Sequence, residues 1–242
     1  FRSTALRNIN RQFNYILNLA EIKETPDGRR RRLDILEIYN CSIIRTLHLR
    51  CNRPKDESQN IGYRLIMNIR FAQETDLDSI LKVIETAFSD EENKVIMNLV
   101  EELHQGTNSP PIKSLVAEVD DQLIGYVSYS PIFLKSDFSI SGYILAPLAV
   151  SSEHQKQGVG SNLIKSGIDM LTKDGAKVLL VYGDPTYYGS FGFKEEIGHS
   201  FVPPYTLQYP FGWTGMMLNE TSIPEQPIQF ECVAALSKLE LW

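Results

Sequence analysis

Residues 148–160 read Leu-Ala-Val-Ser-Ser-Glu-His-Gln-Lys-Gln-Gly-Val-Gly, an apolar run that passes into a glycine-containing turn. The apolar start predicts a strand. The residues after the turn predict a helix, because their apolar side chains recur with a period of 3.6. These side chains are Val159, Leu163, Ile164, Ile168 and Leu171. A helix N-terminus presents free backbone N–H groups to an anion, and Gly158 and Gly160 place no Cβ atom in its way. The stretch therefore predicts a phosphate-binding turn.

The spacing of Gln155, Gly158 and Gly160 narrows the kind of phosphate site. The dinucleotide fingerprint G-x-G-x-x-G and the P-loop G-x-x-x-x-G-K-[ST] both have a different spacing. The motif resembles instead the Q/R-x-x-G-x-G/A pyrophosphate loop of the GNAT superfamily of acetyl-CoA-dependent N-acetyltransferases. The residues alone leave open the alternative that the glycines only form a tight turn between a strand and a helix, where glycine is common.

The resemblance implies that acetyl-CoA is the acyl donor and co-substrate. It also implies which residues of the strand, the turn and the helix start bind it. These are Leu148, Ala149, Val150, Gln155, Lys156, Gln157, Gly158, Val159, Gly160 and Ser161.

A second segment follows the predicted helix. Residues 177–182 have the apolar pattern of a buried strand, and residues 183–193 continue as Gly-Asp-Pro-Thr-Tyr-Tyr-Gly-Ser-Phe-Gly-Phe. This segment resembles the late strand and short helix of GNAT proteins, and its form is similar to the bacterial branch called YhbS-like acetyltransferases. Two motifs in the right order are more specific than either alone. The resemblance extends from Met67 to Ala235 and is strongest over residues 144–193.

The fold that this resemblance implies is α/β (α+β). A mixed, mostly antiparallel central sheet is flanked by helices and splayed at the acyl-CoA site. The residues themselves predict a first strand over 69–71 and a helix capped by Thr75. Ser89 and Glu92 form the capping-box pattern of a second helix. Two strands over residues 115–119 and 123–129 surround a hairpin turn, and two more are expected over 213–218 and 229–235.

Pro147 lies inside the strand predicted over residues 140–150. Proline has no N–H to donate to a neighbouring strand, so it predicts a bulge or a strand that separates from its neighbour. In GNAT folds the sheet splays beside this strand and the acyl-pantetheine arm lies in the gap. The residue pattern and the resemblance therefore point to the same place in the sheet.

The charge changes sign along the chain. Residues 1–66 carry 13 Lys and Arg against 7 Asp and Glu, whereas residues 67–242 carry 11 against 23. The chain begins at Phe1, and its first methionine, Met67, directly precedes the GNAT-like pattern. We interpret residues 1–66 as a basic N-terminal extension, from upstream in-frame translation or from cloning, and not as a functional domain. Residues 67–242 form the GNAT-like N-acetyltransferase domain in this interpretation.

Composition excludes several classes of protein. No apolar run approaches the roughly 18 residues that a membrane helix needs. Cys41, Cys51 and Cys232 are scattered, which argues against a disulfide framework and a metal site and favours a reducing, cytoplasmic location. Arginines at 29–32 are the feature that would suggest nucleic-acid binding, but no aromatic residues are interleaved with them. We therefore expect no membrane, metal or nucleic-acid partner.

Tyr188 is the candidate catalytic residue. The resemblance implies that its phenol acts as a general acid near the sulfur of the acyl donor. A phenol with a pKa of about 10 can donate to a departing thiolate whose thiol has a pKa near 8.5. The alternative is that Tyr188 only packs under Phe191 and Phe193, because aromatic side chains often cluster. Tyr187 fits the family pattern less well.

No general base emerges from the sequence. Residues 141–146 offer no carboxylate at the place where some GNAT enzymes have a glutamate. Asp184 is a candidate for a water-relayed base, although its place before Pro185 favours a turn or helix cap. The acidic residues at 90–92 either attract a cationic amine or only suit a helix N-terminus. Four aromatic residues are candidates for the acceptor pocket, with a core role favoured: Tyr205, Tyr209, Phe211 and Trp213.

The predicted function is therefore an acyltransferase that moves acetyl from acetyl-CoA to a primary amine of a small molecule or a protein. The alternative is a non-catalytic acyl-CoA-binding module that keeps the fold and the loop but has no base. The acceptor amine is not identified by the sequence, because the residues that would shape its pocket lie in the least patterned segments.

Overall fold

The computed structural model describes residues 23–24, 30–31, 67–106, 108–134, 142–219 and 223–242. The chain divides into two compact units, Phe1–Arg64 and Leu65–Trp242. In the first unit, the two-residue strands β1 (Lys23–Glu24) and β2 (Arg30–Arg31) pair antiparallel. The interpretation of residues 1–66 as a dispensable extension otherwise concerns residues outside the described ranges.

The second unit alternates between helices and strands as the sequence patterns predict. Its elements are, in chain order, β3 (Asn68–Phe71), η1 (Glu74–Asp76), α3 (Leu77–Ala87), α4 (Asp90–Gln105), β4 (Lys113–Val119), β5 (Gln122–Leu134), β6 (Gly142–Val150), η2 (Ser152–His154), α5 (Val159–Lys173), β7 (Val178–Tyr182), α6 (Pro185–Gly189), α7 (Glu195–His199), β8 (Phe201–Val202), η3 (Pro210–Gly212), β9 (Trp213–Met217), β10 (Ile228–Cys232), η4 (Ala234–Leu236) and η5 (Leu239–Leu241).

The strands form one mixed sheet with the order β3-β4-β5-β6-β7-β9. Along this path only β6 and β7 are parallel, and every other neighbouring pair is antiparallel. Strand β10 pairs antiparallel with residues 132–134 of β5, and β8 pairs parallel with β10. The prediction of a mixed, mostly antiparallel sheet flanked by helices is confirmed.

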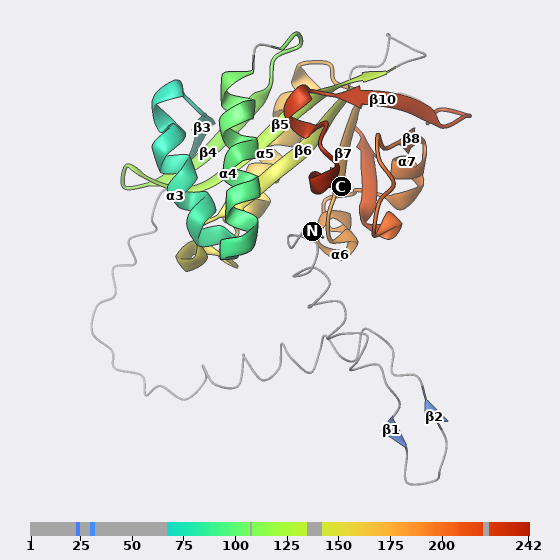
Figure 1. The fold of residues 1–242 in the computed structure, drawn as a ribbon, viewed down its shortest axis with the longest axis horizontal. Coiled ribbons are helices and arrows are strands. Elements are labelled where there is room, and N and C mark those ends of the chain that lie inside the picture. Colours follow the sequence, from blue (N-terminus) through green and yellow to red (C-terminus); the bar gives the residue numbers. More distant parts are fainter. Residues whose placement is uncertain (1–22, 25–29, 32–66, 107, 135–141, 220–222) are drawn as a thin grey trace. The chain divides into compact units, whose positions relative to one another are not determined.

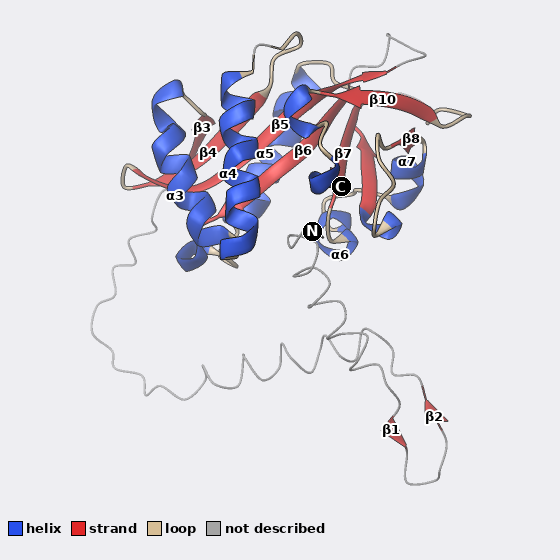
Figure 2. Cartoon of the chain, viewed as in Figure 1, coloured by secondary structure: helices blue, strands red, loops and turns tan. Residues whose placement is uncertain are grey.

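Strands β6 and β7 are joined over a short length only. Gly142–Ile144 pair with Val178–Leu180, and residues 145–150 of β6 continue without a partner on β7. The register between β5 and β6 shifts where Val127 faces Leu148 and Tyr129 faces Leu145. Strand β6 therefore has one more residue than β5 at this place, in the segment that contains Pro147. The bulge and the separation that this proline predicts are both present, and β6 and β7 diverge in Figure 2.

Helices cover both faces of the sheet (Figure 1). Helix α3 packs on β5 and β6 on one face, with α4 beside it, and α5 packs on β4, β5 and β6 on the other. The α5 side of the core contains Val159, Leu163, Ile164 and Leu171, four of the five residues that define the predicted apolar stripe. Ile168, the fifth, is partly buried against the same cluster. Burial of this stripe fixes the helix, and its N-terminus, against the sheet.

Local signals at the helix and hairpin ends are mostly confirmed. The Glu92 carboxylate accepts hydrogen bonds from Ser89 N at 3.3 Å and Ser89 Oγ at 2.9 Å. The hairpin between β4 and β5 turns through Asp120 and Asp121, whose φ angles are 50° and 61°. The prediction that Thr75 caps the first helix is wrong. Thr75 lies inside η1, because the Asp76 carboxylate accepts the backbone N–H of Gln73 at 2.7 Å and starts the turn two residues earlier.

Candidate active site

The turn between β6 and α5 is held by side-chain hydrogen bonds to the backbone. Gln155 Nε2 donates to the carbonyl oxygen of Val150 at 3.1 Å, and Gln157 Nε2 donates to that of Glu153 at 2.7 Å. Lys156 lies between them in the left-handed region, with a φ angle of 60°, and its side chain is exposed. Both glutamines thus stabilise the turn, because their side-chain NH2 groups are hydrogen-bonded to backbone carbonyl oxygens.

Gly158 caps α5 with a φ angle of 88°, a conformation that a residue with a Cβ atom adopts only at a cost. The first backbone hydrogen bond of the helix runs from Asn162 N to Gly158 O at 3.0 Å. The N–H groups of Val159, Gly160 and Ser161 precede it, so they have no acceptor within the helix and point out of its N-terminus. This end of α5 is suited to an anion because these donors and the helix dipole act together.

The remaining predicted binding residues are divided between the faces of the sheet. Leu148 and Val150 pack on the α5 side, whereas Ala149 is buried on the α3 side. Val159 is the first residue of α5 and its side chain is buried, so only its backbone is available to a ligand at the turn. All three strand residues belong to the part of β6 that has no partner on β7. Their backbone groups, more than their side chains, border the place where the sheet splays.

Tyr188 lies on α6, directly after β7. Its ring contacts Tyr187 at a centroid distance of 5.2 Å and Phe193 at 5.7 Å, both edge to face. Burial raises the pKa of Tyr188 well above its ordinary value, and the neighbouring Tyr187 and Asp184 act in the same direction. A phenol with a raised pKa stays protonated, so Tyr188 is suited to donate a hydrogen bond and not to act as a base.

Tyr188 is also close to the middle of the sheet. It is partly buried against the cluster that contains Tyr129, and the pKa of Tyr129 is raised mainly by burial and further by Tyr188. Tyr129 is fully buried on β5, and its hydroxyl donates to the carbonyl oxygen of Leu163 in α5 at 3.2 Å. Tyr188 therefore packs from α6 onto the α5 side of the sheet.

Asp184 serves as a helix cap. Its carboxylate accepts the backbone N–H of Thr186 at 2.8 Å, and Pro185 occupies the first position of α6. This is the role that the sequence favours over a water-relayed base. Asp90, Glu91 and Glu92 lie in the first turn of α4, where Glu92 completes the capping box. In both places a carboxylate that the sequence offers for base catalysis or for attracting the amine is instead a cap at a helix N-terminus.

The four aromatic candidates for an acceptor pocket separate into two groups. Trp213 is 2% exposed, and its indole N–H donates to the carbonyl oxygens of Gly198 and Phe201 at 2.9 and 2.8 Å. Tyr205 donates to the carbonyl oxygen of Ser237 at 2.9 Å and contacts Trp242. These two are structural, as favoured.

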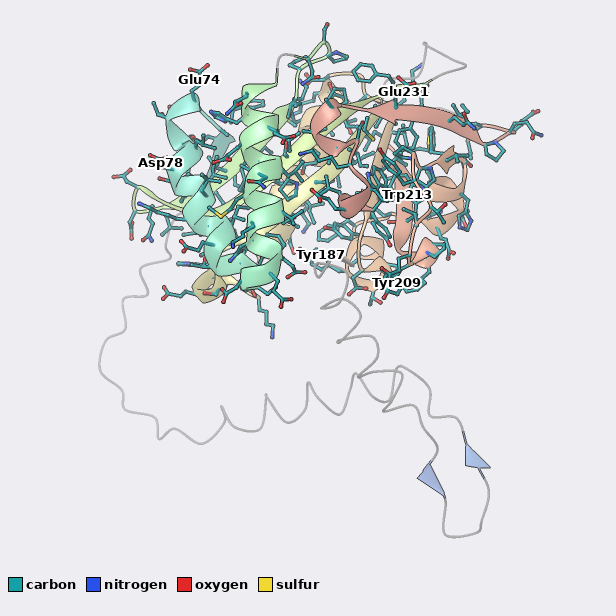
Figure 3. The ribbon with its side chains drawn as sticks, in the orientation of Figure 1. Glu74, Asp78, Tyr187, Tyr209, Trp213 and Glu231 are labelled. Atoms are coloured by element: carbon teal, nitrogen blue, oxygen red, sulfur yellow. The ribbon has the colours of Figure 1, made fainter. Side chains whose placement is uncertain are left out.

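Tyr209 and Phe211 lie at the end of β7. The backbone N–H of Tyr209 donates to the hydroxyl of Tyr182 at 2.9 Å, and the ring centroids of Tyr209 and Phe211 lie 5.8 Å apart. Phe211 is 41% exposed. In Figure 3 Tyr209 lies towards the same edge of the domain as Tyr187, whereas Trp213 lies among the interior side chains. Tyr209 and Phe211 thus remain candidates for the acceptor side.

The position of Tyr187 next to the turn is not predicted by the sequence. Its side chain reaches the turn, where the hydroxyl oxygen lies 2.9 Å from the position that a Cβ atom on Gly160 would take. The sequence contains two adjacent tyrosines, and nothing in their spacing from the turn shows which one points towards it. The direction depends on how α6 is packed on β7 and β9, which is a tertiary property.

These observations can be compared with known proteins. A family model described as "Acetyltransferase (GNAT) domain" matches residues 68–195, more than half of the chain. The chain therefore belongs to the GNAT acetyltransferase family. The predicted identification of the family is confirmed, and with it the prediction that the chain is an acetyl-CoA-dependent N-acetyltransferase by family.

Two relatives come from Escherichia coli (strain K12). The uncharacterized N-acetyltransferase YjhQ is 33% identical over 129 residues, which cover 52% of this chain and 71% of YjhQ. The uncharacterized N-acetyltransferase YhbS is 36% identical over 86 residues, which cover 35% of this chain and 51% of YhbS. Similarity to the YhbS-like branch, which the segment at 183–193 predicts, is therefore found as well.

Solved structures support the fold. The GNAT family N-acetyltransferase YhbS from Escherichia coli in complex with CoA has a TM-score of 0.63 at 24% identity and covers 75% of this chain and 97% of its own. A GNAT family acetyltransferase from Brucella melitensis in complex with acetyl-CoA has a TM-score of 0.51 at 25% identity and covers 72% and 99%. Both matched chains are covered almost completely.

None of the helices in the described ranges is long and apolar enough to cross a membrane. Within the same ranges, no group of three or more His, Cys, Asp or Glu side chains could hold a metal ion.

Proposed function

We propose that this chain binds acetyl-CoA with its diphosphate on the turn at residues 155–161 and its thioester in the splay between β6 and β7. There it transfers the acetyl group to a primary amine of a small molecule or a protein. The observation that carries the proposal is the coincidence of two features at one edge of β6. Over residues 145–150 the strand pairs with β5 but has no partner on the β7 side, and it leads through the turn into the N-terminus of α5.

Backbone groups do most of the binding in this proposal. The N–H groups at the start of α5 donate to the diphosphate oxygens, with the helix dipole favouring the negative charge. The pantetheine arm contains amide groups, which are able to pair with the N–H and C=O groups that β6 leaves without a partner. An unpaired strand edge is a common place for such added pairing. The bulge at Pro147 lies within this part of β6, which has no partner on β7.

The reaction needs a neutral amine, because an alkylammonium with a pKa of about 10.4 is not a nucleophile. The amine nitrogen attacks the thioester carbon, forming a C–N bond and a tetrahedral oxyanion. Collapse of this intermediate breaks the C–S bond. Tyr188 gives its phenolic proton to the departing thiolate and regains a proton from water, while the proton that the amine loses passes to solvent. The products are the acetylated amine and the free thiol of CoA.

A specific observation favours a second candidate, the non-catalytic acyl-CoA-binding module. Strand β6 carries no carboxylate, and Asp184 is engaged as the cap of α6. A module of this kind binds acetyl-CoA through the same turn but does not accelerate acetyl transfer.

One experiment separates the two candidates. The purified chain is mixed with acetyl-CoA and a panel of primary amines that includes polyamines, amino sugars and lysine peptides, and release of free thiol is followed in time. We expect amine-dependent release with at least one panel member, and binding of acetyl-CoA by calorimetry. Binding without release for any amine supports the module instead, and absence of binding contradicts both.

A cytoplasmic location is supported by Cys232, because this cysteine is a buried free thiol and free thiols are usual in reducing compartments.

The family match begins at residue 68, next to the first residue of the predicted domain. We expect a chain that starts at Met67 to bind acetyl-CoA and melt like the full chain. A melting temperature lowered by many degrees would show that residues 1–66 pack against the domain.

A further inference from the structure

Tyr187 and Gly160 share one small volume. A Cβ atom built on Gly160 would lie 2.9 Å from the Tyr187 hydroxyl oxygen, 3.6 Å from Val150 and 3.8 Å from Leu148. The space beside the second residue of α5 is therefore filled by a phenol hydroxyl that comes from another element. The glycine of the motif makes room for Tyr187 as well as for an anion, and the hydroxyl lies at the helix N-terminus.

Ser161 is the next residue of the helix. Burial raises the pKa of the Tyr187 phenol above its ordinary value, and hydrogen bonding with the Ser161 side chain acts in the opposite direction. The ring is nevertheless 37% exposed. The hydroxyl end is thus held against the turn while the side chain stays accessible to a ligand. Two hydroxyl groups stand beside the N–H groups that point out of α5.

Hydroxyl groups can donate to phosphate oxygens, and such charge-assisted hydrogen bonds are stronger than neutral ones. We propose that Tyr187 is a further binding residue for the diphosphate of acetyl-CoA, acting with Ser161 as a side-chain wall of the anion site at the start of α5. This inference rests on the function proposed above, which assigns the turn only through its backbone and motif residues. It adds a residue from α6, which is separated from the turn by one helix, α5, and one strand, β7.

The geometry has a consequence for Tyr188. The Tyr187 ring contacts Tyr188 at 5.2 Å and Phe191 at 5.3 Å, and all three residues belong to or directly follow the short helix α6. A helix of five residues has little stability of its own. Contact of Tyr187 with the bound diphosphate therefore fixes α6 at the moment when Tyr188 is needed. Tyr187 is a binding residue for the cofactor and a positioning residue for Tyr188.

The test compares two acyl donors, acetyl-CoA and S-acetyl-pantetheine, which lacks the diphosphate. Tyr187→Phe keeps the ring and removes only the hydroxyl. We expect its Kd for acetyl-CoA, measured by calorimetry, to rise about 10- to 100-fold, as for loss of a hydrogen bond to a charged group. Its Kd for S-acetyl-pantetheine, measured by competition with acetyl-CoA, should change less than twofold. Ser161→Ala is the partner variant, and the double variant should lose less than the sum of both, because the two hydroxyls act on one group.

Each outcome decides between defined alternatives. If wild type binds acetyl-CoA and Tyr187→Phe binds it equally well, the assignment of Tyr187 is wrong and the proposed function stands. Equal losses for both donors would place the effect of Tyr187 away from the diphosphate and also overturn the inference. A wild-type chain that binds no acetyl-CoA overturns the proposed function together with this inference. The melting temperature of Tyr187→Phe shows whether the variant is folded. If it is not, Ser161→Ala alone must show the same selective loss for acetyl-CoA, or the inference fails.

Discussion

Tyr188→Phe is expected to lower kcat by about 10²–10⁴-fold, the range for loss of a positioned general acid. The affinity for acetyl-CoA should change little, because the phenol faces Phe193 and the sheet while the turn at the start of α5 is where the diphosphate is proposed to bind. Turnover is measured by thiol release with the best amine of the panel, and affinity by calorimetry. The effect is thus expected in kcat and not in Kd.

The pH dependence of turnover gives a second readout for Tyr188. Burial raises the pKa of this phenol, so the protonated form that donates to the thiolate persists as the pH rises past about 10, the ordinary value for tyrosine. We therefore expect wild-type kcat not to fall up to pH 10 through loss of this group. The slow residual rate of Tyr188→Phe should lack any limb from a phenol at higher pH.

A purely structural Tyr188 would behave differently. Phenylalanine fills the same space beside Tyr187 and Phe193, so the rate would barely fall, and the free energy of unfolding would drop by no more than about 1 kcal/mol, the usual contribution of a single hydrogen bond. Turnover and melting temperature of the same variant distinguish the two roles. A turnover close to that of wild type would rule out the general-acid role, and Tyr187→Phe would then be tested for it.

The double variant Gly158→Val and Gly160→Val is expected to abolish measurable binding of acetyl-CoA. A β-branched residue at 158 must adopt a φ angle near 88°, which costs about 1–2 kcal/mol and moves the turn. At 160 the added atoms enter the space of the Tyr187 hydroxyl and of the anion. Calorimetry measures the binding, and thermal unfolding measures the accompanying loss of stability.

Gly175 supplies a matched control at the other end of α5. Its φ angle is 79°, and nothing lies within 4 Å of a Cβ atom built on it. Gly175→Val therefore carries the same kind of backbone strain without touching the turn. It should lower the melting temperature and leave the affinity for acetyl-CoA unchanged. If the double variant at 158 and 160 keeps wild-type affinity, the assignment of the turn as the diphosphate site is wrong.

Local signals in the sequence were sufficient for most of the fold. The stripe of α5, the capping box of Ser89 and Glu92, and the hairpin at residues 120–121 depend on neighbours within a few positions, so they could be predicted. Thr75 was assigned wrongly as a cap because Asp76 and Gln73 satisfy each other and start the turn earlier. Competing polar residues at one helix start cannot be ranked from their order alone.

The candidate site was predictable where it depends on backbone conformation, and less so where side chains from distant elements meet. The turn needs a positive φ angle at Gly158, which glycine permits, and Pro147 has no N–H to donate. Both features can therefore be predicted from the residue type alone. The meeting of Tyr187 with Gly160 and Ser161 depends on the placement of α6 beside α5. No periodicity or spacing within either segment contains that information.

The short ladder between β6 and β7 would give a ligand bound there a structural role in the domain. Only three residue pairs connect the two strands, so the part of the sheet that contains β7 and β9 is attached to the part that contains β3 to β5 through few hydrogen bonds. A pantetheine arm along β6 would restore the missing ones. Amide hydrogen exchange of residues 145–150 should then slow when acetyl-CoA is added, and the melting temperature should rise with its concentration. The concentration of acetyl-CoA would then determine the stability of the folded protein as well as its rate of acetyl transfer.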